Sequence, residues 1–183
     1  RPLWLGIEER MVLGSGAGAP AAVSQQIAST DSRFQRISVS WRELQPTAPA
    51  NPTDWQDGAG GSFDQTAISQ LDDAIRAASC PDICTTPGAG LQVILEIEGA
   101  PDWAQLSPRP TSGIPSKELA ELNAYPGSWR PDPVAFGQLA QALATRYDGT
   151  RHAVYNNHLL PKVEYFQAWN EPNLSTHLAP QYD

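Results

Sequence analysis

Four short segments rich in aliphatic and aromatic residues have the pattern of strands: residues 3–7, 34–40, 91–97 and 163–169. Short apolar runs of this kind are typical of buried strands, whereas helices need longer, periodic segments. The pattern therefore predicts four strands spread along the chain.

Segments with helical spacing lie between these strands. Residues 20–30 are rich in alanine and glutamine, and Pro20 suits the first turn of a helix. A second helix is predicted after Ser62 and Gln65, which have the spacing of a capping box. Its apolar positions recur at helical intervals, at Phe63, Ala67, Leu71, Ala74 and Ala78.

A third helix is predicted from Asp132, with that residue as its N-terminal cap and Pro133 at its first position. The positions expected to face inward are Val134, Leu139, Ala140, Leu143 and Tyr147. Strands that alternate with helices predict parallel βαβ units with right-handed crossovers, and therefore the α/β fold class.

The loops that follow the second and third predicted strands are long. Residues 41–61 and 99–131 are rich in proline, glycine and tryptophan. Loops of that length usually carry function. In α/β folds they lie beyond the carboxyl ends of the strands, so we expect the active site at that edge of the sheet.

Composition narrows the class of protein. The chain has 183 residues, of which 40% are hydrophobic and 17% charged, a balance that fits one globular domain over residues 1–183. The formal net charge is −8, which argues against a nucleic-acid partner because polyanions bind basic patches. No run of about 18 apolar residues occurs, so we expect no membrane span.

Two cysteines, Cys80 and Cys84, lie close together with a proline between them. We expect a small disulfide, with a pair of free thiols as the alternative. A metal site would need two further ligands, and His152, His158 and His177 show no supporting spacing. A disulfide would favour an oxidising compartment, so we expect a secreted or extracytoplasmic protein.

The most informative segment ends the fourth predicted strand, where residues 165–169 continue directly into Asn170-Glu171-Pro172. Proline cannot continue the strand ladder, so we expect a turn there that leaves Asn170 and Glu171 at the open edge. A carboxyl group at that edge can act as a general acid. The alternative is an ordinary loop carboxylate.

Residues 169–173, Trp-Asn-Glu-Pro-Asn, resemble the fourth-strand signature of the clan A glycoside hydrolases, a retaining group that includes families 5 and 39. Residues 36–41 resemble the clan's second strand, and residues 99–104 resemble the third-strand loop of family 39-like bacterial enzymes. Residues 136–147 and 177–181 also fit the pattern. The segments follow the family's order along nearly the whole chain.

This resemblance implies a (β/α)₈ TIM-type barrel, of which the chain covers about the first four βα units. It implies that Glu171 is the catalytic acid/base and that Asn170 hydrogen-bonds the sugar 2-hydroxyl. Arg36 matches the arginine that supports the nucleophile, with a structural ion pair as the alternative. The family requires no cofactor and no metal.

Three more residues are candidates for substrate binding. Trp103 and Trp41 could stack on the apolar face of a sugar, and core packing is the alternative for both. Glu98 ends the third predicted strand and could reach substrate hydroxyls, or it could be solvated or salt-bridged. Trp169 is expected in the core.

The chain departs from the family in one respect. A retaining mechanism needs a second carboxylate about 5 to 5.5 Å from the first, and in this clan that nucleophile is a glutamate on strand seven. The 183 residues account for four strands, whereas a complete barrel takes about 250 residues. We therefore expect two partners: a carbohydrate substrate, and a C-terminal half supplied by the same gene product or a second chain.

Two other functions stay open. The same barrel could be a non-catalytic carbohydrate-binding pseudoenzyme, which a missing strand-seven glutamate would favour. It could also be another barrel enzyme, such as a lyase or aldolase. Lys117 and Lys162 lie in predicted loops, which counts against a Schiff-base aldolase. The preferred interpretation is a retaining hydrolase that cleaves O-glycosidic bonds of a β-glycoside or polysaccharide.

The disulfide can be tested directly. Thiol titration of the unfolded protein without reductant should find no reactive thiol at Cys80 or Cys84, and two after reduction. Two thiols before reduction would remove the main sequence argument for export.

Overall fold

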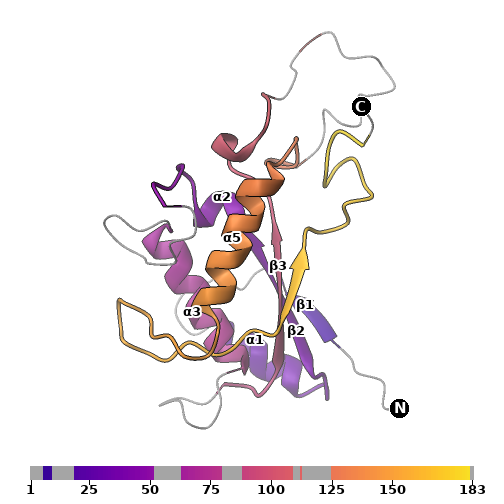
Figure 1. Ribbon diagram of the computed structural model, residues 1–183. Helices are drawn as coiled ribbons and strands as arrows, with labels where there is room; N and C mark the ends of the chain where they lie inside the picture. The colour runs from indigo at the N-terminus through magenta and orange to yellow at the C-terminus, as the bar shows by residue number, and fades with distance from the viewer. Residues whose placement is uncertain are drawn as a thin grey trace.

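The computed structural model describes residues 6–9, 19–51, 63–79, 88–108, 112 and 125–181. Within these residues, four strands form one parallel sheet in the order β1-β2-β3-β4. They are β1 (Gly6–Glu9), β2 (Phe34–Ser40), β3 (Gln92–Glu98) and β4 (Tyr165–Ala168). The helices are α1 (Ala19–Ala28), α2 (Trp41–Leu44), α3 (Gln65–Ser79), η2 (Asp102–Ala104, a 3-10 helix) and α5 (Pro133–Arg146) (Figure 1). The predicted α/β class, with parallel strands, is confirmed.

The strand predictions lie close to the structure. β2 covers the predicted residues, and β3 begins and ends one residue later than predicted. β1 extends to Glu9, beyond its predicted end at Ile7. β4 is shorter than predicted because it ends at Ala168 and the chain turns at Trp169, where φ is 68°.

Helix α5 begins as predicted. The Asp132 carboxylate accepts hydrogen bonds from the amides of Val134 and Ala135, at 2.8 and 3.4 Å, and Pro133 occupies the first turn. Val134 itself is 68% exposed, so its predicted inward position is wrong. It shares an exposed stripe of the helix with Gly137 and Gln141, at the spacing that places residues on one helical face.

Helix α3 begins at Gln65, later than a cap at Ser62 would predict. Asp64 is its cap, because its carboxylate accepts hydrogen bonds from the amides of Thr66 and Ala67, at 3.0 and 2.9 Å. The prediction of a cap at Ser62 is therefore wrong, and Ser62 itself lies outside the described residues. Aspartate and serine are both favoured at the N-terminal cap of a helix, and here the Asp64 carboxylate is the acceptor.

The three crossover helices α1, α3 and α5 lie on one face of the sheet (Figure 1). Parallel strands in sequential order require this, because right-handed crossovers pass over the same face each time. Alternate residues of β2 and β3 point to that face and are buried there. Together with helix residues they form the core, which includes Ile37, Val39, Ile68, Leu71, Ile75, Leu95, Ile97, Leu139 and Leu143.

The opposite face of the sheet is polar at its centre. Strand register places Arg36 and Ser38 on this face with Glu96 of β3 and Gln167 of β4. Glu96 Oε2 accepts a hydrogen bond from Ser38 Oγ at 2.7 Å and lies 3.8 Å from Arg36 Nε. Arg36 Nη1 donates to Gln167 Oε1 at 3.3 Å. These contacts connect three strands across the face that the described helices leave uncovered.

A buried ion pair joins α3 to the end of α5. Arg146 donates to both carboxylate oxygens of Asp72, from Nε at 3.0 Å and from Nη2 at 2.6 Å. The Tyr147 hydroxyl donates to the same carboxylate at 2.8 Å. Burial, reinforced by the negative charge of Asp72, raises the pKa of Tyr147 well above its ordinary range. The phenol therefore stays protonated and remains a donor.

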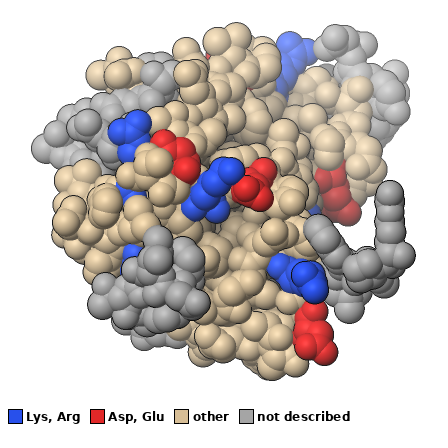
Figure 2. Space-filling model, turned by 60° about the horizontal axis from the view of Figure 1, so that its bottom comes forward, with Lys and Arg blue, Asp and Glu red and all other residues tan. Residues whose placement is uncertain are grey.

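The end of the molecule at which the strands begin carries mixed charges. Figure 2 shows Lys and Arg side chains beside Asp and Glu side chains on that face, without a broad patch of one sign among the described residues in view. In the part of the chain that the structure describes, no helix is long and apolar enough to cross a membrane.

Replacing Asp72 tests the buried ion pair. Asp72→Ala should lower the free energy of unfolding by about 3–5 kcal/mol, because Arg146 would stay buried without its counter-charge. Asp73→Ala changes the exposed neighbour on the same helix and should cost less than about 0.5 kcal/mol. Denaturant unfolding of the two variants gives the comparison, and equal losses would contradict the role assigned to Asp72.

Candidate active site

The fourth strand ends in a strained turn. Ala168 pairs with Ile97, and the next amide, that of Trp169, donates to the Ile97 carbonyl at 3.0 Å. Trp169 and Glu171 both adopt positive φ, 68° and 39°. Each such residue costs about 1–3 kcal/mol, and strain of this kind is concentrated at functional sites.

The strained turn places the side chains of Trp169 and Glu171 in different surroundings. Trp169 is 7% exposed and packs edge-on against Phe136 with ring centroids 5.8 Å apart, so its predicted place in the core is confirmed. Glu171, two residues later, has a side chain that is 59% exposed. The predicted turn occurs, but it starts at Trp169 and not at Pro172.

His177 lies between two carboxylates at the carboxyl ends of β3 and β4. Its Nε2 is 3.4 Å from Glu171 Oε2, and its Nδ1 is 3.8 Å from Glu98 Oε2. The Asn170 amide nitrogen is 3.5 Å from the same Nδ1, and Asn170 is 5% exposed. Two acids, an imidazole and an amide therefore meet at the edge where α/β enzymes place their chemistry.

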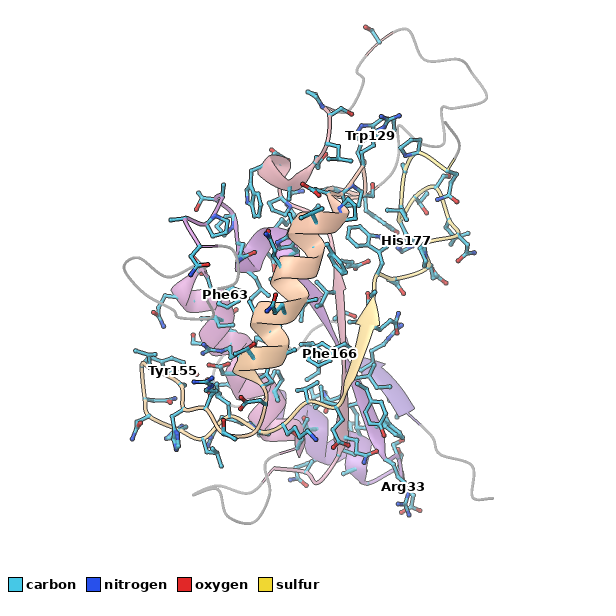
Figure 3. All side chains as sticks on the ribbon, viewed as in Figure 1. Arg33, Phe63, Trp129, Tyr155, Phe166 and His177 are labelled. Carbon is cyan, nitrogen blue, oxygen red and sulfur yellow. The ribbon has the colours of Figure 1, made fainter. Side chains whose placement is uncertain are left out.

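A neighbouring loop also contacts the imidazole. The Tyr125 ring contacts the His177 ring edge-on, with centroids 4.9 Å apart. The Tyr125 amide donates to the Thr176 carbonyl at 2.7 Å, and the Trp169 indole donates to the His177 carbonyl at 2.7 Å. Figure 3 shows His177 and Trp129 at the same end of the molecule, away from Arg33 and Tyr155.

The loop of Tyr125 is fixed by a close backbone contact. Gly127 has a φ of +83°, and a β-carbon there would lie 2.5 Å from the Ala100 carbonyl oxygen. Its own carbonyl accepts a hydrogen bond from the Ala100 amide at 2.8 Å. Only glycine can bring the loop this close to the segment that follows β3.

The structure brings three of the predicted site residues together: Glu171, Asn170 and Glu98. Arg36 lies on the same face of the sheet, but its register position is nearer the amino end than that of Glu98. Its described contacts are with Gln167 and Glu96. These contacts correspond to the ion-pair alternative, and a role for Arg36 in supporting a nucleophile stays a prediction.

The two tryptophans lie on the helical side. Trp41 has no exposed surface and packs edge-on against Trp103 and Phe136, each with ring centroids 5.7 Å away. The prediction that Trp41 stacks on a sugar is therefore wrong: it begins α2 and is a core residue. Trp103 is partly buried, and its indole donates to the Gln45 carbonyl at 2.9 Å.

Sequence reasoning missed His177 and Tyr125 as members of the site. His177 follows Glu171 in the same loop, and that proximity was a usable signal once Glu171 had been singled out. Tyr125 offered no local signal, because the residue that it contacts, His177, is far from it in the sequence.

The described residues contain no candidate metal site. No group of three or more His, Cys, Asp or Glu side chains among them could hold a metal ion. The predicted disulfide of Cys80 and Cys84 lies outside the described residues.

Comparison with known proteins assigns no family. No protein-family model matches the chain. A similar stretch occurs in the progesterone receptor of Gallus gallus, which is 27% identical over 106 residues. The match covers 58% of this chain and only 12% of the receptor's length. A likeness of that extent bears neither for nor against the resemblance to glycoside hydrolases.

Gly127 can be tested by adding one methyl group. Gly127→Ala should lower the free energy of unfolding by about 1–3 kcal/mol or more, because it combines a positive φ with a backbone clash. The matched control is Gly137→Ala, on the exposed side of α5, where a β-carbon meets nothing within 4 Å. That change should be neutral or stabilise by up to about 1 kcal/mol. Similar stabilities for both variants would contradict the close approach.

Proposed function

We propose that this chain forms the first four βα units of a (β/α)₈ barrel, in a retaining glycoside hydrolase that uses Glu171 as acid/base. The observation that carries the proposal is the cluster of Glu171, Asn170, His177 and Glu98 beyond the carboxyl ends of β3 and β4. The resemblance of residues 169–173 to the clan A signature is the basis for the chemical role proposed for this cluster.

The topology supports a barrel over a doubly wound sheet. Doubly wound folds reverse their strand order and place helices on both faces. Here the order is sequential and the crossover helices share one face. The polar contacts of Arg36 and Glu96 then lie where a closed barrel has its interior.

An apolar groove beside β4 supports a further βα unit at that edge. It has a volume of about 540 Å³, and Phe166 on the same edge strand is 39% exposed. The residues that line the groove include Phe136, Ala168, Trp169, Pro172 and Leu178. In the proposed barrel the C-terminal half covers this groove, and it is the partner that brings the nucleophile.

Glu171 has the exposure that proton transfer to a substrate requires. Its carboxyl group protonates the glycosidic oxygen as the bond breaks, and then takes a proton from the water that attacks the glycosyl-enzyme. The Asn170 amide hydrogen-bonds the sugar 2-hydroxyl. His177 lies 3.4 Å from the Glu171 carboxylate, and in this proposal Glu98 accepts hydrogen bonds from substrate hydroxyls.

The second carboxylate of a retaining mechanism comes from the other half of the barrel in this proposal. It attacks the anomeric carbon from the face opposite Glu171. The 183 residues alone should therefore show no glycosidase turnover, whereas the parent protein cleaves with retention of configuration. We also propose that the protein is exported, as the Cys80–Cys84 pair first indicated.

Glu171→Ala in the parent protein tests the acid/base assignment. Turnover of β-glycosides with poor leaving groups should fall by about 10²- to 10⁴-fold, and that of activated aryl β-glycosides by much less. Added azide should restore the second step and yield a glycosyl azide. Glu164→Ala, an exposed glutamate before β4, is the control and should leave rates unchanged.

Unchanged rates in Glu171→Ala would overturn the assignment. Sugar binding without turnover in the parent protein would favour the pseudoenzyme instead. Robust turnover by the isolated 183 residues would contradict the need for a nucleophile from the other half.

A further inference from the structure

The segment after β4 turns back on itself and brings His177 beside Glu171. The Leu174 amide donates to the Glu171 carbonyl at 2.9 Å, and the His177 amide donates to the Leu174 carbonyl at 3.0 Å. The Trp169 indole donates to the His177 carbonyl at 2.7 Å, so a core residue also holds this backbone. Figure 3 shows His177 just beyond the carboxyl end of β4. The position of the imidazole is therefore set by the fold of this segment.

The titratable side chains that face the His177 ring come from three segments. Glu171 Oε2 lies 3.4 Å from Nε2, Glu98 Oε2 lies 3.8 Å from Nδ1, and the Tyr125 ring contacts the imidazole edge-on. The His177 side chain is only 10% exposed. Contact of the ring with solvent is therefore small, and the groups around it determine which nitrogen carries the proton.

The amide of Asn170 identifies the ring nitrogen that accepts a hydrogen bond. Its Nδ2 lies 3.5 Å from His177 Nδ1, and Asn170 is buried. An amide nitrogen can only donate, so the ring nitrogen that faces it has to be the acceptor. In a neutral imidazole the proton is then on the other nitrogen. That nitrogen is Nε2, which faces Glu171.

A proton on Nε2 makes His177 a donor towards Oε2 of Glu171. This donor suits both forms of the carboxyl group, because Oε2 keeps a lone pair when the acidic proton is on Oε1. The transferable proton is thereby placed on Oε1, the oxygen that is left to face the glycosidic oxygen. The 3.4 Å separation is long for a hydrogen bond, and hydrogen bonds of catalytic groups often tighten when the substrate binds.

We propose that His177 is a positioning residue that accepts a hydrogen bond from Asn170 at Nδ1 and donates one from Nε2 to Glu171. A single ring then orients both the amide that binds the sugar 2-hydroxyl and the carboxyl group that transfers the proton. Asn170 keeps its second N–H and its oxygen for the sugar. The inference rests on the proposed glycosidase function and deepens it.

The other forms of the ring would have different consequences. With the proton on Nδ1, the ring would donate towards Glu98, and Nε2 would accept the acidic proton of Glu171. That proton would then be directed away from the substrate. An imidazolium would donate from both nitrogens, so that Nδ1 could no longer accept from Asn170. The proposal therefore specifies the neutral ring with its proton on Nε2.

Nitrogen NMR of the parent protein distinguishes these forms without requiring turnover. The protein is labelled with ¹⁵N-histidine and followed between about pH 5 and 8, the range in which histidines change charge. The His177 resonances are those lost in His177→Gln. When the ring is neutral, its Nε2 should be protonated and its Nδ1 unprotonated. A neutral ring with the proton on Nδ1, or a ring that stays doubly protonated throughout, would overturn the proposal.

Two replacements of His177 test its role in turnover. His177→Gln keeps an N–H that can donate to Glu171, whereas His177→Leu has no donor. With β-glycosides that have poor leaving groups, His177→Leu should lower kcat by about 10- to 100-fold, the effect of losing a hydrogen bond to a charged group, and change KM little. His177→Gln should recover much of that loss. Equal losses of kcat in the two variants would indicate a purely structural role and contradict the proposal.

His158→Leu is the matched control, because His158 is an exposed histidine in the loop before β4. It should leave both kcat and KM unchanged. A parent protein that hydrolyses no glycoside would remove the proposed function, whereas the NMR spectra would still decide whether His177 connects Asn170 to Glu171. In an active parent protein, unchanged turnover in His177→Leu would overturn the inference and leave Glu171 as the acid/base.

Discussion

The Asp72 carboxylate, buried between Arg146 and Tyr147, is the constraint on which the placement of the candidate site depends. It connects α3, which leads into β3, to the end of α5, which leads towards β4. Desolvating these charges is costly unless the geometry is good, and here both carboxylate oxygens are engaged. At the other end of α5, Phe136 packs between Trp41 and Trp169. Together with the pairing of β4 to β3, these two attachments hold in place the strand ends that Glu98 and Glu171 follow.

The candidate site is assembled from the ends of regular elements and from loops that hold one another. The Gly127 loop is hydrogen-bonded to the segment after β3 and to the segment that carries His177. Positive φ at Trp169 directs its indole to the core, while Glu171 projects outwards. Strain in this turn is offset by packing of Trp169, so a rigid scaffold holds an exposed carboxylate. That division between a buried anchor and an exposed acid suits the role proposed for Glu171.

The two faces of the sheet differ in polarity. The helical face is apolar and closed by α1, α3 and α5, whereas the opposite face carries Arg36 and Glu96 in contact across strands. A charged pair of this kind is stable where its remaining hydrogen-bonding groups are also satisfied. The exposed apolar surface near Phe166 belongs to the same proposal, since a further βα unit would bury it.

The local sequence was enough to predict those features that depend only on neighbouring residues. The bounds of β2, the cap at Asp132 and the position of Asn170-Glu171-Pro172 just after a strand all follow from neighbouring residues, and the structure agrees with each. Even here, the N-terminal cap of α3 was decided by hydrogen bonds to Asp64, because the sequence offers two residues that suit this position. Helical periodicity likewise did not predict that Val134 is exposed, because positions one residue apart on α5 can lie on the buried or on the exposed face.

Tertiary structure decided everything that depends on contacts between distant segments. Asp72 and Arg146 are 74 residues apart in the sequence, and neither carries a mark of its partner. Trp41 looked equally suited to a sugar and to the core, and only its burial beneath α5 settled the choice. The meeting of Glu98, Glu171 and His177 depends on strand register, which aligns the ends of β3 and β4. The sequence singles out Glu171, but pairing between strands determines which groups surround it.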